Sequence, residues 1–227
     1  MIRTATGYCL LALTALPLTV QAAPAPLGLG QVVILVGPPG SGKSVQARIL
    51  GRKYKVPVIS VAELARTAMG KHQASPGGSG GVPNSGELLS DEAAIELISA
   101  RAGQADTGKG FILDGYPNSE AQAKFLDSLV AQRGLQPPKV VVLDAPDSVV
   151  RERMLKRRSV DDSPANIDRR LQDYHREEGF LNAWYKPANT VRVDGTREPA
   201  EVFRQIEEGL VRVFDRKGFQ ERGVPKP

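Results

Sequence analysis

The stretch Gly37-Pro-Pro-Gly-Ser-Gly-Lys43-Ser44 decides the fold of this chain. It follows an apolar, β-branched run at 32–36 and leads into a helix-forming stretch at 45–54. The pattern fits G-x-x-x-x-G-K-[S/T], a loop that cradles phosphate groups between a strand and a helix. The alternative is an ordinary Gly/Pro turn, which the agreement of motif and context disfavours. The sequence therefore predicts a nucleoside triphosphate site at this loop.

Each residue type in the loop suits that chemistry. Gly37, Gly40 and Gly42 let the backbone bend so that successive N–H groups face one anion, next to a helix N-terminus. Lys43 adds a mobile cation for the terminal phosphates, and the Ser44 hydroxyl is a ligand type that Mg²⁺ accepts. The predicted nucleotide-binding residues of the loop are Gly37, Gly40, Ser41, Gly42, Lys43, Ser44 and Val45.

Length and composition favour one α/β domain. The chain has 227 residues, of which 41% are hydrophobic, enough for a sizeable core. The formal charge of +5 suits anionic ligands. It does not indicate nucleic acid, because no basic stripe interleaved with aromatic residues accompanies it.

The first 22 residues form a separate segment that we interpret as a signal peptide. Arg3 is its only charge, a mostly apolar run follows, and Val20-Gln21-Ala22 supplies small residues for cleavage before Ala23. We therefore expect an exported protein without stable membrane association after cleavage. The alternative is an uncleaved extension or a wrongly assigned start, which leaves a cytoplasmic protein. Cys9 is the only cysteine, so the mature chain has no thiol for disulfides, catalysis or metal binding.

Beyond a Pro/Gly linker at 23–30, strand signals alternate with helical stretches. Strands are expected at 32–36, 57–60, 110–114, 140–144 and 190–194. Helices are expected at 43–54, 61–69, 91–101, 119–133, 148–157, 164–185 and 199–217, with Tyr174, Trp184 and Tyr185 on a buried face. This alternation predicts a parallel sheet with helices on both faces and ligands at the carboxyl ends of the strands. The Gly/Ser/Pro-rich segment 71–86 is not expected to hold a regular helix, and is either a flap over the site or a solvated loop.

A second motif, Phe111-Ile-Leu-Asp114-Gly115-Tyr116-Pro117, delivers a carboxylate to the end of an apolar strand. There Asp114 can orient Mg²⁺ through water, and Gly115 permits close approach of a ligand to the backbone. A strand-terminal Asp is more often a turn or cap residue, but the neighbouring phosphate loop favours the metal role.

From Gln31 to about Val213 the chain resembles the adenylate kinase family of nucleoside monophosphate kinases. The matching blocks, in order, are 37–46, 59–66, 86–92, 110–117 with Gln122, 153–158, 161–175 and 193–196. The resemblance implies a P-loop α/β fold with a five-stranded parallel sheet in one domain at 31–217. Within it, 61–90 would bind the monophosphate and 158–163 would be a vestigial lid, followed by a tail at 218–227.

The resemblance also implies ATP and Mg²⁺ as cofactors and a role for each matching residue. Lys43, Asp114, Arg157 and Arg170 would be catalytic, with Ser44 and Asp114 at the metal, and Arg153 would stack on the adenine of ATP. The monophosphate would meet Arg66, Leu89, Gly115, Asn118 and Gln122. Structural alternatives stay open: a solvated helix face for Arg153 and Arg157, an ion pair with Asp173 or Glu177 for Arg170, and a Ser119-x-x-Gln122 capping box.

Several positions depart from the family pattern. Asn118 stands where the family carries an arginine that grips the monophosphate, Val61 replaces a threonine, and Glu87 replaces a common lysine. Only Ser159 and Val160 separate Arg158 from Asp161, so there is little chain to close as a lid. The leading expectation is an ATP-dependent nucleoside monophosphate kinase. The two alternatives are a nucleotide-binding protein with little or no kinase activity and a P-loop kinase for a small non-nucleotide acceptor. We expect a monomer, since no coiled-coil pattern is evident.

Overall fold

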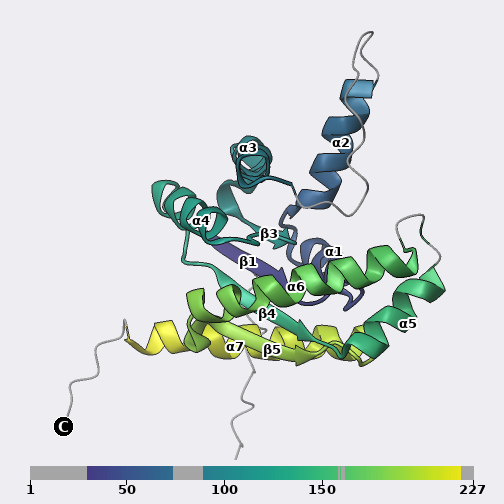
Figure 1. Cartoon of the computed structure of the whole chain (residues 1–227). Helices are drawn as coiled ribbons and strands as arrows, with labels where there is room; N and C mark the ends of the chain where they lie inside the picture. The colour runs from purple at the N-terminus through teal and green to yellow at the C-terminus, as the bar shows by residue number, and fades with distance from the viewer. Residues whose placement is uncertain (1–29, 74–88, 158, 160–161, 221–227) are drawn as a thin grey trace, which may run out of the picture.

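The computed structural model describes residues 30–73, 89–157, 159 and 162–220. At its centre is a parallel five-stranded sheet in the order β2-β3-β1-β4-β5 (Figure 1). The strands are β1 (Gln31–Val36), β2 (Val58–Ser60), β3 (Gly110–Asp114), β4 (Lys139–Asp144) and β5 (Thr190–Asp194). The predicted five-stranded parallel sheet is therefore confirmed, and each strand lies within one residue of its predicted bounds.

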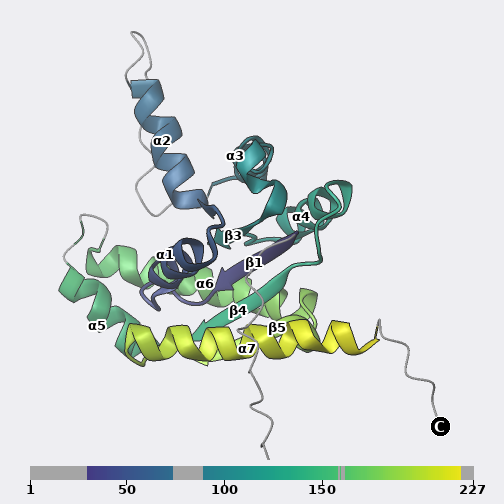
Figure 2. The same ribbon diagram turned by 180° about the vertical axis from the view of Figure 1, so that it is seen from behind.

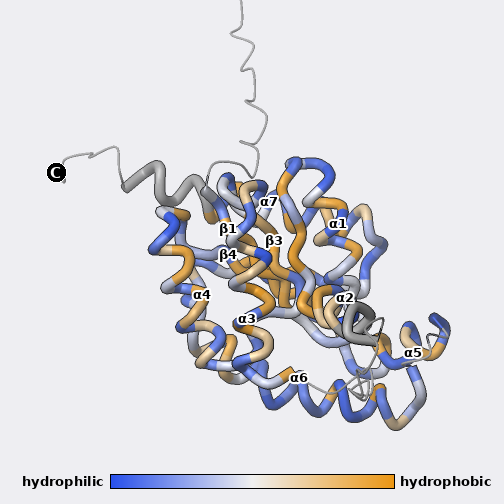
Figure 3. Tube along the Cα trace, turned by 90° about the horizontal axis from the view of Figure 1, so that it is seen from above, coloured by the Kyte–Doolittle hydropathy of each residue, from blue (hydrophilic) through white to orange (hydrophobic). Residues whose placement is uncertain are grey.

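Helices cover both faces of the sheet, which explains the unbroken apolar runs in β1, β3 and β4. Val32, Ile34 and Val36 of β1 face a core shared with α3 (Asp91–Ala102), α4 (Glu120–Gln132) and α6 (Pro164–Trp184). Val33 and Leu35 face the opposite core, shared with α1 (Lys43–Tyr54) and α7 (Pro199–Gln220) (Figure 2). Seen from above, the trace of α6 along the edge of the molecule is mostly hydrophilic, whereas hydrophobic residues gather in the strands at its centre (Figure 3).

Two further helices, α2 and α5, lie beside this frame. α2 (Val61–Gln73) projects away from the sheet in both ribbon views, and α5 (Asp147–Arg157) packs on α6 through Val150, Met154, Ile167 and Leu171. Short 3-10 turns at Ala105–Lys109 and Pro187–Asn189 had not been predicted. None of the helices within the described ranges is long and apolar enough to cross a membrane.

Two helix ends were predicted too early. α7 continues through Gln220, beyond the predicted end at 217 and into the predicted tail. The other error concerns α2. The sequence analysis placed the end of α2 at residue 69 and the irregular segment from 71, but the helix continues through Gln73. The residues 71–73 carry neither Gly nor Pro, and the breakers begin only at Pro76. The rest of that segment, Glu87, and residues 158, 160 and 161 of the predicted lid lie outside the described residues, as do the predicted signal peptide and the end of the tail.

The three aromatic residues predicted to be core differ in burial. Tyr185 is buried, whereas Trp184 and Tyr174 are half-buried. Trp184 packs against the α3–α4–α6 core, and its indole N–H donates to Asp127 Oδ2 at 3.1 Å. The indole therefore lies at the edge of the core, where its polar edge finds a partner.

Candidate nucleotide-binding site

The phosphate loop joins β1 to α1 and requires glycine at two crowded positions. Gly37 and Gly40 have positive φ angles of 143° and 85°. A Cβ on Gly37 would lie 2.5 Å from the Leu143 carbonyl oxygen, and one on Gly40 would lie 2.9 Å from Met154 Cγ. Gly42 (φ 100°) is the N-cap of α1 and provides no side-chain cap, so the first N–H groups of this helix stay available to an anion.

Lys43 folds back into this loop. Its ammonium donates to the carbonyl oxygens of Gly37 at 2.6 Å and of Pro38 at 2.8 Å. Burial lowers its pKa to about 8, although the nearby Asp114 carboxylate acts in the opposite direction. The Ser41 hydroxyl is buried and has no hydrogen-bond partner among the described residues. The loop thus holds a cation and a spare polar group, as an anion site requires.

Asp114 ends β3 at the same edge of the sheet. It pairs in register with Leu35 of β1 and with Ser60 of β2, and its side chain is only 6% exposed. Ser44 stands exposed in the first turn of α1. The described residues form no cluster of three or more acidic, histidine or cysteine side chains that could cage a metal. This donor set fits Mg²⁺, which binds through one or two protein groups, phosphate oxygens and water.

Three arginines near the predicted lid are held by defined partners. Arg153 donates to the carbonyl oxygens of Gly195 at 2.6 Å and Thr196 at 2.8 Å. Arg157 forms a bidentate pair with Asp162 at 2.7 and 2.8 Å, and Arg170 reaches the same carboxylate at 3.4 Å. The Asp162 side chain is 1% exposed, and the Arg157 guanidinium keeps its pKa below the usual range. Asp162 therefore joins the two predicted catalytic arginines, a role that the sequence analysis did not assign.

On the acceptor side, Gln122 is almost fully buried and its side-chain amide has two partners. Its Nε2 donates to Asp91 Oδ1 at 2.8 Å, and its Oε1 accepts from the Asn118 N–H at 2.8 Å. The Ser119 hydroxyl accepts the Gln122 N–H at 3.2 Å, which confirms the N-cap of the predicted capping box. The box is altered, however, because the Gln122 amide reaches Asn118 and not Ser119 itself.

The other predicted acceptor residues are more loosely arranged. Leu89 is half-buried against the core, and Gly115 has a φ of 76° with open space beside its Cα. Arg66 is exposed on α2, and the described residues give it no hydrogen bond or ion pair with another predicted site residue. The structure thus brings Lys43, Asp114 and Arg170 within electrostatic reach of one another, but not Arg66.

Comparisons with known proteins agree with this geometry. The family model described as adenylate kinase matches residues 35–190. An adenylate kinase of Xanthomonas campestris pv. campestris (strain B100) is 37% identical over 185 residues, covering 79% of this chain and 99% of that protein. The adenylate kinase of Rhizobium meliloti (strain 1021) is 34% identical, with coverage of 78% and 98%, and adenylate kinase 1 of Nostoc sp. is 37% identical, with coverage of 78% and 97%.

The chain belongs to the adenylate kinase family. It is therefore a phosphotransferase of the nucleoside monophosphate kinase type that uses ATP and Mg²⁺, with a nucleoside monophosphate as its partner. The P-loop and the Asp114 motif identified this family correctly from the sequence. The individual roles of the site residues remain predictions.

Glu177 interacts with the phosphate loop, although the sequence analysis mentioned it only as a possible ion-pair partner of Arg170. Glu177 is half-buried on α6, and its charge interacts with that of Lys43. Burial, followed by repulsion from Asp173, raises its pKa to about 7. Its position seven residues after Arg170 places both on one face of α6, a signal that helical periodicity could have supplied.

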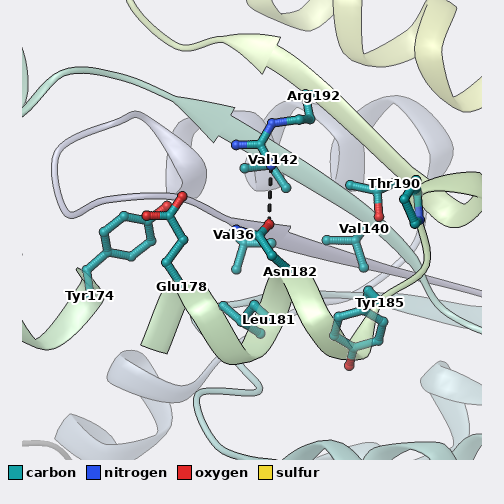
Figure 4. Close-up of a pocket in the computed structure, with 11 residues that line it drawn as sticks. Val36, Val140, Val142, Tyr174, Glu178, Leu181, Asn182, Tyr185, Thr190 and Arg192 are labelled. Atoms are coloured by element: carbon teal, nitrogen blue, oxygen red, sulfur yellow. Dashed lines mark hydrogen bonds between the residues drawn. The ribbon is translucent and has the colours of Figure 1, made fainter. Parts of the chain in front are cut away.

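A separate cavity of about 150 Å³ lies between α6 and the strands β4 and β5 (Figure 4). Its walls are mainly apolar, and at its rim Arg192 donates to Asn182 Oδ1 at 3.2 Å. None of the predicted site residues lines it. This cavity is therefore distinct from the predicted nucleotide site.

Proposed function

We propose that this kinase transfers the γ-phosphoryl group of MgATP to AMP or a related nucleoside monophosphate. The observation that supports the proposal best is the cluster at the carboxyl ends of β1 and β3. There the Lys43 ammonium lies in the phosphate loop, within electrostatic reach of Asp114 and Arg170. Three groups far apart in the sequence thus converge where a triphosphate would end.

Phosphoryl transfer depends mainly on positioning and charge stabilisation, so no general base is required of this chain. Lys43 would leave the Gly37 and Pro38 carbonyl oxygens and bind the phosphate that is transferred. Arg157 and Arg170 would neutralise charge on the equatorial oxygens, with Asp162 as their common anchor. Mg²⁺, when bound near Ser44 and Asp114, would neutralise charge on the triphosphate.

The donor adenine would lie against Arg153, whose guanidinium is held in place by the turn after β5. A fixed, planar guanidinium is suited to stacking on a base. Arg66, Leu89, Gly115, Asn118 and Gln122 would form the acceptor side. Because Asn118 carries no charge, the acceptor phosphate would lose an arginine contact worth about 2–4 kcal/mol when desolvated. A weakly held monophosphate is therefore expected.

A second candidate function is nucleotide binding with little turnover. It is favoured by the buried Asp162 carboxylate, which engages both Arg157 and Arg170. If these arginines stay on Asp162 when ATP binds, the transferring phosphoryl group receives little charge stabilisation. The two candidates differ in turnover and not in ATP affinity.

The test is ADP formation from MgATP by the full-length protein, with AMP, CMP, UMP, GMP and dAMP offered in turn. Saturable turnover with one monophosphate supports the kinase proposal and identifies the acceptor. Lys43→Ala is expected to abolish turnover. Lys53→Ala, which removes an exposed charge of α1 that pairs with Glu207 of α7, is expected to preserve it. Tight ATP binding without turnover on any acceptor would favour the second candidate.

A further inference from the structure

Asp91 connects two helices at the acceptor side of the site. It is the first residue of α3, and its Oδ1 accepts hydrogen bonds from Ser119 Oγ and from Gln122 Nε2, both at 2.8 Å. Both donors belong to the start of α4, about 30 residues further along the chain. One carboxylate oxygen therefore fixes the position of α4 relative to α3.

The Asp91 carboxylate is not the N-cap of its own helix. Ser90 is the N-cap of α3, and its hydroxyl accepts the Ala93 N–H at 3.3 Å. The carboxylate of Asp91 is directed instead to the α4 residues. The interaction with the α3 dipole is favourable, but it does not require this direction.

The consequence concerns the orientation of the Gln122 amide. A glutamine amide can usually turn over and exchange its donor and acceptor sides. Here a turned amide would place Oε1 against the Asp91 carboxylate and Nε2 against the Asn118 N–H, so that both hydrogen bonds would be lost. Asp91 and the Asn118 backbone thus fix Nε2 on one side and Oε1 on the other.

The fixed amide keeps a limited capacity for a ligand. Nε2 carries two hydrogens and Oε1 two lone pairs, and each has one protein partner. One donor and one acceptor remain, side by side, on a residue that is 4% exposed. Such an edge matches a base that offers a ring-nitrogen acceptor beside an amino group. It mismatches a base of the same shape that offers N–H beside a carbonyl.

We propose that Asp91 is a positioning residue that sets base selectivity by fixing the Gln122 amide, so that the acceptor site takes amino bases such as adenine over lactam bases such as hypoxanthine. The proposal rests on the proposed function, because it assumes that Gln122 faces the acceptor base. The ribose phosphate of the acceptor prevents the base from simply turning over to restore the match.

The test compares AMP with IMP, which differ only at this edge of the base. For the wild type, kcat/KM for AMP is expected to exceed that for IMP by on the order of tenfold to a hundredfold. Asp91→Asn keeps the shape but can offer either an N–H or a carbonyl to Gln122, so the AMP/IMP ratio is expected to fall about tenfold. Ser119→Ala is the matched control, because it removes the cap and one Asp91 contact but leaves the Asp91–Gln122 bond. It is expected to lower Tm and to keep the ratio within about twofold.

Kd values for AMP and IMP are measured with the same proteins, so that failure of the kinase proposal can be distinguished from failure of the proposed role of Asp91. Turnover with an unchanged ratio in Asp91→Asn would overturn the role of Asp91 alone. Selective binding without turnover would overturn the kinase proposal and support the role of Asp91. If Asp91→Asn does not fold, Gln122→Met, which keeps the bulk and removes the amide, is expected to bring the ratio close to one, and retention of the wild-type ratio would refute the proposal.

Discussion

The lowered pKa of Lys43 predicts that MgATP binding weakens as the pH rises above neutrality. In the free protein burial in the phosphate loop brings this pKa to about 8. Phosphate oxygens favour the charged ammonium, so ATP raises the pKa of Lys43 and binds the protonated form. Affinity is then constant where free Lys43 is already protonated, and falls where binding must first add a proton.

The size of the effect follows from this pKa. Between pH 7 and pH 9 the protonated fraction of a group with a pKa of 8 falls from about 0.9 to about 0.1. The Kd for MgATP is therefore expected to rise about tenfold, or by about 1.4 kcal/mol, if Lys43 stays protonated in the complex. Below pH 7 the contribution of Lys43 to this dependence disappears.

Ionisation of Glu177 adds a second step, at lower pH, to the pH dependence of MgATP affinity. Its pKa of about 7 means that the carboxylate forms between pH 6 and pH 8, next to the site of the phosphates. A new negative charge there weakens ATP binding in the same direction as the loss of the Lys43 proton. Because burial raises the folded-state pKa of Glu177 from 4.5 to about 7, the fold loses stability as the pH rises from 4.5 to about 7, and the loss is complete above that pH. Glu177→Gln is expected to remove the lower step and to stabilise the free protein at pH 8.

The assay is calorimetric titration of MgATP at constant ionic strength from pH 6 to pH 9.5. For the wild type, the affinity for MgATP should fall in two steps as the pH rises. Glu177→Gln should keep only the step at higher pH, and Lys43→Met should bind more weakly and lack that step. ATP loses its last phosphate proton near pH 6 to 7, so data above pH 7.5 isolate the protein groups. An affinity that stays constant or increases between pH 7.5 and pH 9 would refute the reasoning on Lys43.

Three further outcomes are expected. Asp162→Asn should lower kcat at least tenfold and destabilise the fold by about 2 kcal/mol, because a neutral amide cannot anchor both Arg157 and Arg170, and a thermal melt with single-turnover kinetics checks both effects. Asn118→Arg should lower the KM for the monophosphate while Asn118→Gln leaves it unchanged, and equal values for the two variants would contradict the alignment of this position with the family. We propose export with cleavage before Ala23, so the mature protein recovered from cells should begin at Ala23 on N-terminal sequencing, and a chain that begins at Met1 would contradict it.

The sequence predicted those features that local patterns determine. The P-loop follows the buried strand β1, and the motif around Asp114 places a carboxylate at the end of the buried strand β3. A parallel sheet aligns such strand ends, so the meeting of Lys43 and Asp114 followed without coordinates. The bounds of the strands could be predicted equally well, because β1, β3 and β4 are buried on both faces and their sequences are therefore continuous apolar runs.

Contacts made by acidic partners could not be predicted in the same way. Any of several carboxylates is within reach of Arg170 in sequence. Only the packing of α5 on α6 selects Asp162, a buried residue of the segment that connects these two helices. For Gln122 the pattern allowed both a cap and a base contact, and the cap formed by the Ser119 hydroxyl does not use the Gln122 amide. Ser119 caps the helix through its hydroxyl, while the Gln122 side chain is directed to Asp91 and Asn118. A residue can therefore belong to a capping motif and still present a fixed amide edge to a ligand, and the AMP/IMP ratio of Asp91→Asn separates the two contributions.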